Sequence, residues 1–171
     1  RFPAVNQFLD SAGSPALFDI QLVGRSKAIQ LNDGVFTVHT DRLLDEVKKT
    51  DLIFIPALSG DMKTALEINK DLIPWIIGQY KNGAEVASLC VGAFLLASTG
   101  LLKGRQCSTH WLYANEFRAM FPDVELVDAG IITEEQGIYS SGGAASYWNL
   151  LVKKKKKYTD RETAILASKF F

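Results

Sequence analysis

Two apolar segments separated by a helical pattern constrain the fold of this chain more than any other feature of its sequence. Residues 51–56 read DLIFIP, and such a near-continuous apolar run is typical of a strand buried on both faces of a parallel sheet. Residues 85–89 predict the next buried strand, and the helix between them, over residues 72–82, ends at Gly83. Strands that alternate with helices in this way predict a doubly wound, mostly parallel α/β sheet.

The patterns around this pair complete a flavodoxin-like three-layer α/β sandwich with an antiparallel edge hairpin. The hairpin is predicted from the runs IQL and VFTVH on either side of the turn at residues 32–34. Gly13 and Pro122 are the expected stops of two helices. The other predicted helices cover residues 3–12, 43–48, 92–98, 111–121, 148–152 and 162–171, and the other strands cover 18–24, 107–109 and the runs VELV, GIIT and GIYS.

The composition fits one globular domain over residues 1–171, with 47% hydrophobic and 22% charged residues. Lys and Arg number 19, as do Asp and Glu, so no net charge attracts phosphate backbones or anionic membranes. We therefore expect no DNA binding by this chain alone. Five lysines at residues 153–157 interrupt an apolar helical pattern, and a solvated turn or unassigned residues written as lysine explain them better than a DNA-binding patch.

Cysteine usage and the lack of targeting signals point to a reducing cytoplasm. Cys90 and Cys107 are the only cysteines, no apolar run is long enough to span a bilayer, and the opening residues lack a secretory pattern. The sequence contains no G-x-G-x-x-G motif, no Walker motif and no metal-ligand spacing. We expect neither a cofactor nor a metal.

Cys90 stands between the buried strand at 85–89 and the next predicted helix, as in a nucleophile elbow. Gly92 and Ala93 supply the small side chains that such a tight turn requires. A thiol at this position faces unpaired backbone N–H groups, which favour the thiolate and can hold an oxyanion. The alternative is that Cys90 is a small buried hydrophobe, which is the role we expect for Cys107.

His110 opens a predicted helix at the carboxyl edge of the sheet, where ligand crevices lie in α/β folds. One hypothesis pairs it with Cys90 as a base or cation, and the other makes it a capping or core histidine. His39 is expected at the surface. The loops at 56–60 and 140–143 are further sources of backbone N–H groups. The predicted ligand contacts are therefore Cys90, Val91, Gly92, His110, Ser59, Gly60 and Gly142.

Four short motifs follow one another in the second half of the chain: Cys-x-Gly-Ala-Phe at 90–94, Gly-Leu-Leu-x-Gly at 100–104, Thr-His-Trp at 109–111 and Phe-Pro-x-Val at 121–124. With them, the stretch from Ser88 to Trp111 resembles the class I glutamine-amidotransferase-like, or ThiJ/PfpI, superfamily. More narrowly, the chain from about residue 51 to residue 171 resembles the N-terminal domain of AraC-type regulators. That resemblance implies a domain that senses a small-molecule effector and precedes a helix-turn-helix DNA-binding domain, here expected beyond Phe171.

The chain departs from the enzymes of that superfamily at two positions. Val91 follows Cys90, where several of the enzymes place a histidine, and Ala57-Leu58 follows Pro56, where their oxyanion loop is commonly Gly-Gly. We therefore expect a sensor without catalysis that forms a homodimer and reaches DNA through a domain outside this chain.

Two other functions remain open. An isonitrile hydratase of the superfamily shares the Thr-His-Trp feature, so a cysteine-dependent hydrolase or hydratase is the main alternative. A purely structural dimerisation module ranks last, because it leaves the elbow cysteine without a purpose.

Overall fold

The computed structural model describes residues 2–11, 13–31, 34–127 and 132–143. The chain separates into two compact units, one of residues 1–43 with 151–171 and one of residues 44–150, and each is described by itself. The helical patterns predicted at 148–152 and 162–171 and the lysine run at 153–157 lie outside the described residues.

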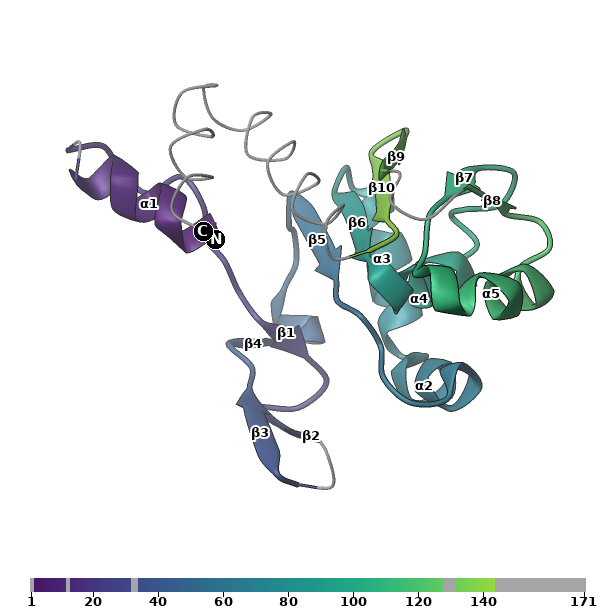
Figure 1. Ribbon diagram of the computed structural model, residues 1–171. Coiled ribbons are helices and arrows are strands. Elements are labelled where there is room, and N and C mark those ends of the chain that lie inside the picture. Colours follow the sequence, from purple (N-terminus) through teal and green to yellow (C-terminus); the bar gives the residue numbers. More distant parts are fainter. Residues whose placement is uncertain (1, 12, 32–33, 128–131, 144–171) are drawn as a thin grey trace. The chain divides into compact units, whose positions relative to one another are not determined.

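The first unit contains the predicted opening helix and the predicted hairpin (Figure 1). Helix α1 spans Phe2–Ser11, and Gly13 follows it with a φ of 71°. The hairpin, β2 (Ala28–Leu31) with antiparallel β3 (Phe36–His39), forms a two-stranded sheet of its own and not the edge of the main sheet. Strand β1 (Val23–Gly24) pairs in parallel with β4 (Arg42–Leu43).

The strand predicted over residues 18–24 is wrong for most of its length, since only its last two residues belong to β1. In this segment, side-chain oxygens accept hydrogen bonds from backbone N–H groups that a strand would donate to its neighbour. Asn6 accepts hydrogen bonds from the N–H groups of Leu17 and Phe18, both at 3.0 Å, and the Asp41 carboxylate accepts one from the Leu22 N–H at 2.7 Å. These partners are distant in sequence, so the local apolar pattern does not reveal them.

The second unit is built on a four-stranded sheet in the order β5-β6-β10-β9. Strands β5 (Leu52–Ile55), β6 (Glu85–Leu89) and β10 (Ile138–Ser141) are parallel, and β9 (Ile132–Glu135) runs antiparallel beside β10 (Figure 1). The mostly parallel sheet is therefore confirmed. Its antiparallel edge is β9.

Two helices join β5 to β6 where the sequence predicted one. Helix α3 (Leu72–Lys81) was predicted, and Gly83 follows it with a φ of 96°. Helix α2 (Met62–Asn69) was missed, although Asp61 caps it by accepting a hydrogen bond from the Thr64 N–H at 2.8 Å. It buries only Met62 and Ala65, so its apolar periodicity is weak.

The remaining elements follow the predictions with shifted bounds. The helix predicted at 43–48 is a short 3-10 turn, and the strand predicted at 107–109 ends at Cys107. The helix predicted at 111–121 begins as a 3-10 turn before it becomes α-helical. These elements are η1 (Leu44–Glu46), η2 (Cys90–Gly92), α4 (Ala93–Ser98), β7 (Gln106–Cys107), η3 (Trp111–Tyr113), α5 (Ala114–Met120) and β8 (Glu125–Leu126), which is parallel to β7.

Helix α4 lies at the centre of the core of this unit. Five of its six residues, 93–97, are buried. Phe94 is fully buried and packs edge to face on Phe117, with ring centroids 5.0 Å apart and an interplanar angle of 87°. This packing anchors the helix that follows Cys90. Of the described helices, none has the length and apolar character needed to cross a membrane.

Candidate functional site

Cys90 occupies a strained position between β6 and α4. Its φ is +54°, in the left-handed region, which costs a residue with a Cβ roughly 1–2 kcal/mol. The only other described residue with a side chain and a positive φ is Gln136, in the turn between β9 and β10. The elbow that the sequence predicted consists of a strand, a cysteine with a left-handed backbone conformation, and a helix. Cys90 is half-buried in this arrangement.

Gly92 fixes the elbow against the end of β5. A Cβ at Gly92 would lie 2.5 Å from the Pro56 carbonyl oxygen and 2.6 Å from that of Ile55, closer than any ordinary contact. The φ of Gly92 is −59°, which any residue can adopt, so the requirement for glycine comes from space alone. The missing side chain allows the turn after Cys90 to pack directly on the β5 backbone.

The sheet register brings two predicted loops to the same edge as Cys90. Ser141 of β10 is paired with Leu89 of β6, so Gly142 follows β10 as Cys90 follows β6. Gly142 is buried. Ser59 and Gly60, which we predicted as ligand contacts, lie in the exposed loop after β5, where Gly60 has a φ of 80°.

His110 caps the turn that follows it, which is one of the two roles that the sequence left open. Its Nδ1 accepts a hydrogen bond from the Leu112 N–H at 3.3 Å. The neutral ring therefore carries its proton on Nε2 and presents a donor on that side. No hydrogen bond joins Cys90 to His110, and both residues belong to the described part of the chain.

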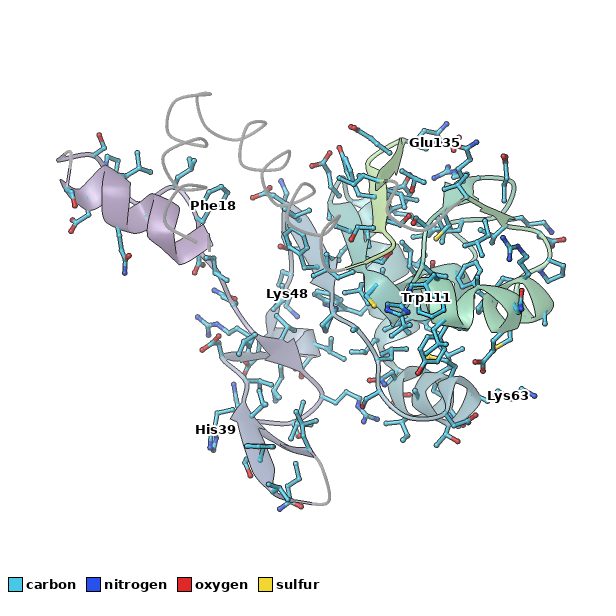
Figure 2. The ribbon with its side chains drawn as sticks, in the orientation of Figure 1. Phe18, His39, Lys48, Lys63, Trp111 and Glu135 are labelled. Carbon is cyan, nitrogen blue, oxygen red and sulfur yellow. The ribbon has the colours of Figure 1, made fainter. Side chains whose placement is uncertain are left out.

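The hydroxyl of Thr109, next to His110, connects this segment to the elbow. Thr109 Oγ1 donates a hydrogen bond to the Cys90 carbonyl oxygen at 3.2 Å, which ties the segment before His110 to the strained residue. Thr109 belongs to the Thr-His-Trp motif, and the sequence alone indicates no role for its hydroxyl. The next two residues are exposed and apolar: 68% of Trp111 (Figure 2) and 64% of Leu112 are accessible to solvent.

The Trp111 ring stacks on His110, with centroids 5.8 Å apart and planes 29° apart. Tyr113 meets the same imidazole edge-on, with centroids 6.2 Å apart and planes at 72°. Two aromatic rings therefore hold the His110 ring in addition to its hydrogen bond to the Leu112 N–H.

The other cysteine and histidine play the roles predicted for them. Cys107 is fully buried, and burial raises the pKa of its thiol to about 12, although its interactions with Ser140 and with the Ser108 backbone act in the opposite direction. It is therefore a packing residue. His39 is exposed on β3 (Figure 2).

A network of buried hydroxyls beside the site escaped the sequence analysis. Ser140 Oγ accepts a hydrogen bond from the Ser108 N–H at 2.7 Å and shares another with Thr133 Oγ1 at 2.6 Å. The only sequence signal was the presence of hydroxyl residues in the apolar runs GIIT and GIYS. Over the residues that the structure describes, no three His, Cys, Asp or Glu side chains gather in a way that could hold a metal ion.

Comparison with known proteins identifies relatives over most of the chain. A model of the DJ-1/PfpI family matches residues 9–155. The HTH-type transcriptional regulator CdhR of Pseudomonas aeruginosa is 28% identical over 110 residues, which are 64% of this chain and 32% of CdhR. The chain thus spans about a third of the length of that relative.

Solved structures share the fold. A candidate transcriptional regulator from Vibrio parahaemolyticus superimposes with a TM-score of 0.84 at 19% identity, over 99% of this chain and 88% of that one. An AraC family transcriptional regulator from Pseudomonas putida gives a TM-score of 0.76 at 15% identity, over 99% of this chain and 87% of that one. At such identities the likeness establishes the flavodoxin-like fold, as the sequence predicted.

Proposed function

Because this chain belongs to the DJ-1/PfpI family, we propose that it is the effector-sensing domain of an AraC-type transcription regulator. Its similarity to the HTH-type regulator CdhR supports this assignment, as does its fold, shared with an AraC family regulator. The observation that favours binding over catalysis is at the elbow: His110 uses Nδ1 to cap its own turn and has no hydrogen bond to Cys90. A thiol without a proton acceptor is poorly equipped for acyl transfer.

The effector site proposed here lies at the carboxyl edge of the sheet around Cys90. Gly142 follows the neighbouring strand in register, and His110 offers its Nε2–H as a donor. Val91 is buried, so it would contribute its backbone N–H and not its side chain. Ser59 and Gly60 would contact the effector from the exposed loop after β5. This arrangement favours an effector with hydrogen-bond acceptors.

DNA contact is assigned to a helix-turn-helix domain outside these 171 residues. The 19 basic and 19 acidic residues of the chain leave no net charge to drive counterion release from DNA. A homodimeric sensor would present two DNA-binding domains at a fixed separation, so that an effector could alter how they engage two half-sites. We place this assembly in the cytoplasm.

The test is a mobility-shift titration of this chain and of the complete protein on upstream DNA, with light scattering of both. We expect the complete protein to bind, this chain alone to give no shift, and both to be dimers. Tight, salt-sensitive binding of DNA by this chain alone would contradict the proposal, and so would a chain that stays monomeric at high concentration.

The strained φ of Cys90 favours a second candidate function, a cysteine-dependent hydrolase or hydratase. Backbone strain of this kind often accompanies a functional side chain. Amide, isonitrile and methylglyoxal substrates should show no turnover if the sensor assignment is right. Turnover that Cys90→Ala abolishes would establish the enzyme instead.

A further inference from the structure

The segment that carries Thr109 and His110 is joined to the main sheet by a side chain. Strand β7 ends at Cys107 and pairs with β8 in a separate two-stranded sheet. Just beyond it, the Ser108 N–H donates to Ser140 Oγ of β10 at 2.7 Å. This bond spans 32 residues of sequence and connects the two sheets.

Ser140 is the centre of a small buried network. Its hydroxyl also shares a hydrogen bond with Thr133 Oγ1 of β9 at 2.6 Å. Ser140, Ser108 and Cys107 have no exposed surface. A backbone N–H at such depth needs an acceptor, because leaving it without one costs the full desolvation of the group. Ser140 therefore satisfies a donor that water does not reach.

This network adjoins the candidate site along the chain. The register pairs Ser140 with Ser88 across β10 and β6. Three of the predicted ligand contacts follow a buried serine by two residues: Cys90 follows Ser88, His110 follows Ser108, and Gly142 follows Ser140.

We propose that Ser140 is a positioning residue of this site, whose hydroxyl holds the segment of Thr109 and His110 beside the Cys90 elbow. Without the hydroxyl, the Ser108 N–H loses the acceptor that ties it to β10. Thr109 then loses its fixed approach to the Cys90 carbonyl oxygen. The inference rests on the proposed function only where it calls this an effector site. The positioning of Thr109 and His110 by Ser140 does not require a bound ligand.

The molecule provides a matched control. Ser88 is also a serine without exposed surface, directly opposite Ser140 in the sheet, and its Oγ has no hydrogen-bond partner among the described residues. Replacing Ser88 by alanine removes an unsatisfied hydroxyl, whereas replacing Ser140 removes a used one. Ser140→Thr keeps a hydroxyl and serves as the rescue variant.

The experiment is amide hydrogen exchange on the complete protein and these three variants, measured without ligand. Exchange at the Ser108 amide is divided by exchange at the Val86 amide, which donates to Gly137 O in the main sheet, so that any loss of global stability cancels. We expect Ser140→Ala to raise this ratio about tenfold or more, and Ser88→Ala and Ser140→Thr to leave it within about threefold of the parent.

A second readout is the rate at which iodoacetamide alkylates Cys90, which should change in Ser140→Ala and stay constant in Ser88→Ala. If Ser140→Ala does not fold, Thr133→Val takes its place, because it removes the other hydroxyl of the shared bond and should raise the ratio less. An unchanged ratio in Ser140→Ala, or an equal rise in Ser88→Ala, overturns the proposal. Since neither readout uses DNA or an effector, failure of the sensor assignment would leave both results intact.

Discussion

Replacement of Gly92 by alanine tests the packing of the elbow on β5. The added Cβ would start 2.5 Å and 2.6 Å from two backbone carbonyl oxygens, so it must move by several tenths of an ångström against a buried strand. Overpacking of this kind costs about 1–3 kcal/mol. At a helical φ, replacing glycine by alanine raises the free energy of unfolding by about 0.4–1 kcal/mol, because it reduces the conformational entropy of the unfolded chain. This stabilisation is smaller than the expected cost of the clash. For a chain of this length, each kcal/mol lowers the melting temperature by roughly 2–4 °C.

We therefore expect Gly92→Ala to melt several degrees below the parent, as followed by circular dichroism. Gly78→Ala is the control, because Gly78 lies inside α3 and an added Cβ there meets nothing within 4 Å. Alanine at such a helical position should stabilise by roughly 0.5–1 kcal/mol. A Gly92→Ala variant that melts at or above the parent temperature, as Gly78→Ala should, would refute the steric argument.

Three further predictions concern single side chains. Iodoacetamide at pH 7 to 9 should label Cys90 in the folded protein and spare Cys107, because burial raises the pKa of the Cys107 thiol to about 12; mass spectrometry that finds Cys107 modified first would contradict this. His110→Ala should lose about 1 kcal/mol in urea unfolding through loss of a cap, and His110→Asn should lose less, since asparagine caps well; equal losses would exclude the capping role. The hydrogen bond from the Thr64 N–H lowers the pKa of the Asp61 carboxyl, so its contribution to stability is present above about pH 4 and is lost as the pH falls through the lowered pKa. The stability difference between the parent and Asp61→Ala should accordingly shrink in acid, and a difference that grows there would be evidence against the cap.

The central strands were predictable because their environment leaves a local trace. A parallel strand covered on both faces is apolar along most of its length, as β5 is, and the adjoining β6 keeps an apolar stretch from Val86 to Leu89 that only Ser88 interrupts. Helix α2 leaves no such trace, since most of its residues are exposed or half-buried. The segment at 18–24 shows the opposite failure, because its apolar residues suggest a strand while Asn6 and Asp41 occupy backbone groups near each end.

The candidate site likewise contains residues that the sequence could predict and residues that it could not. Cys90 and Gly92 were predictable from a strand followed by small residues, because the elbow is formed by neighbours in sequence. Ser140 was not predictable, since its partners are distant in sequence: Thr133 belongs to β9 and Ser108 follows β7, and only the fold brings them to Ser140. The capping role of His110 lies between these cases: capping is local and was anticipated, but only the structure shows that Nδ1 is used for it.

The strain at Cys90 and the contacts that oppose it belong to one arrangement. A glycine at position 90 would adopt a φ of +54° without steric cost, so a cysteine there is retained at the expense of stability. Three features hold the residue in place: Thr109 binds its carbonyl oxygen, Gly92 packs on the end of β5, and the buried helix α4 fixes the chain that follows. Each comes from a different segment of the chain, so the strained φ of Cys90 depends on contacts that the end of β5, the helix α4 and the segment after β7 supply together.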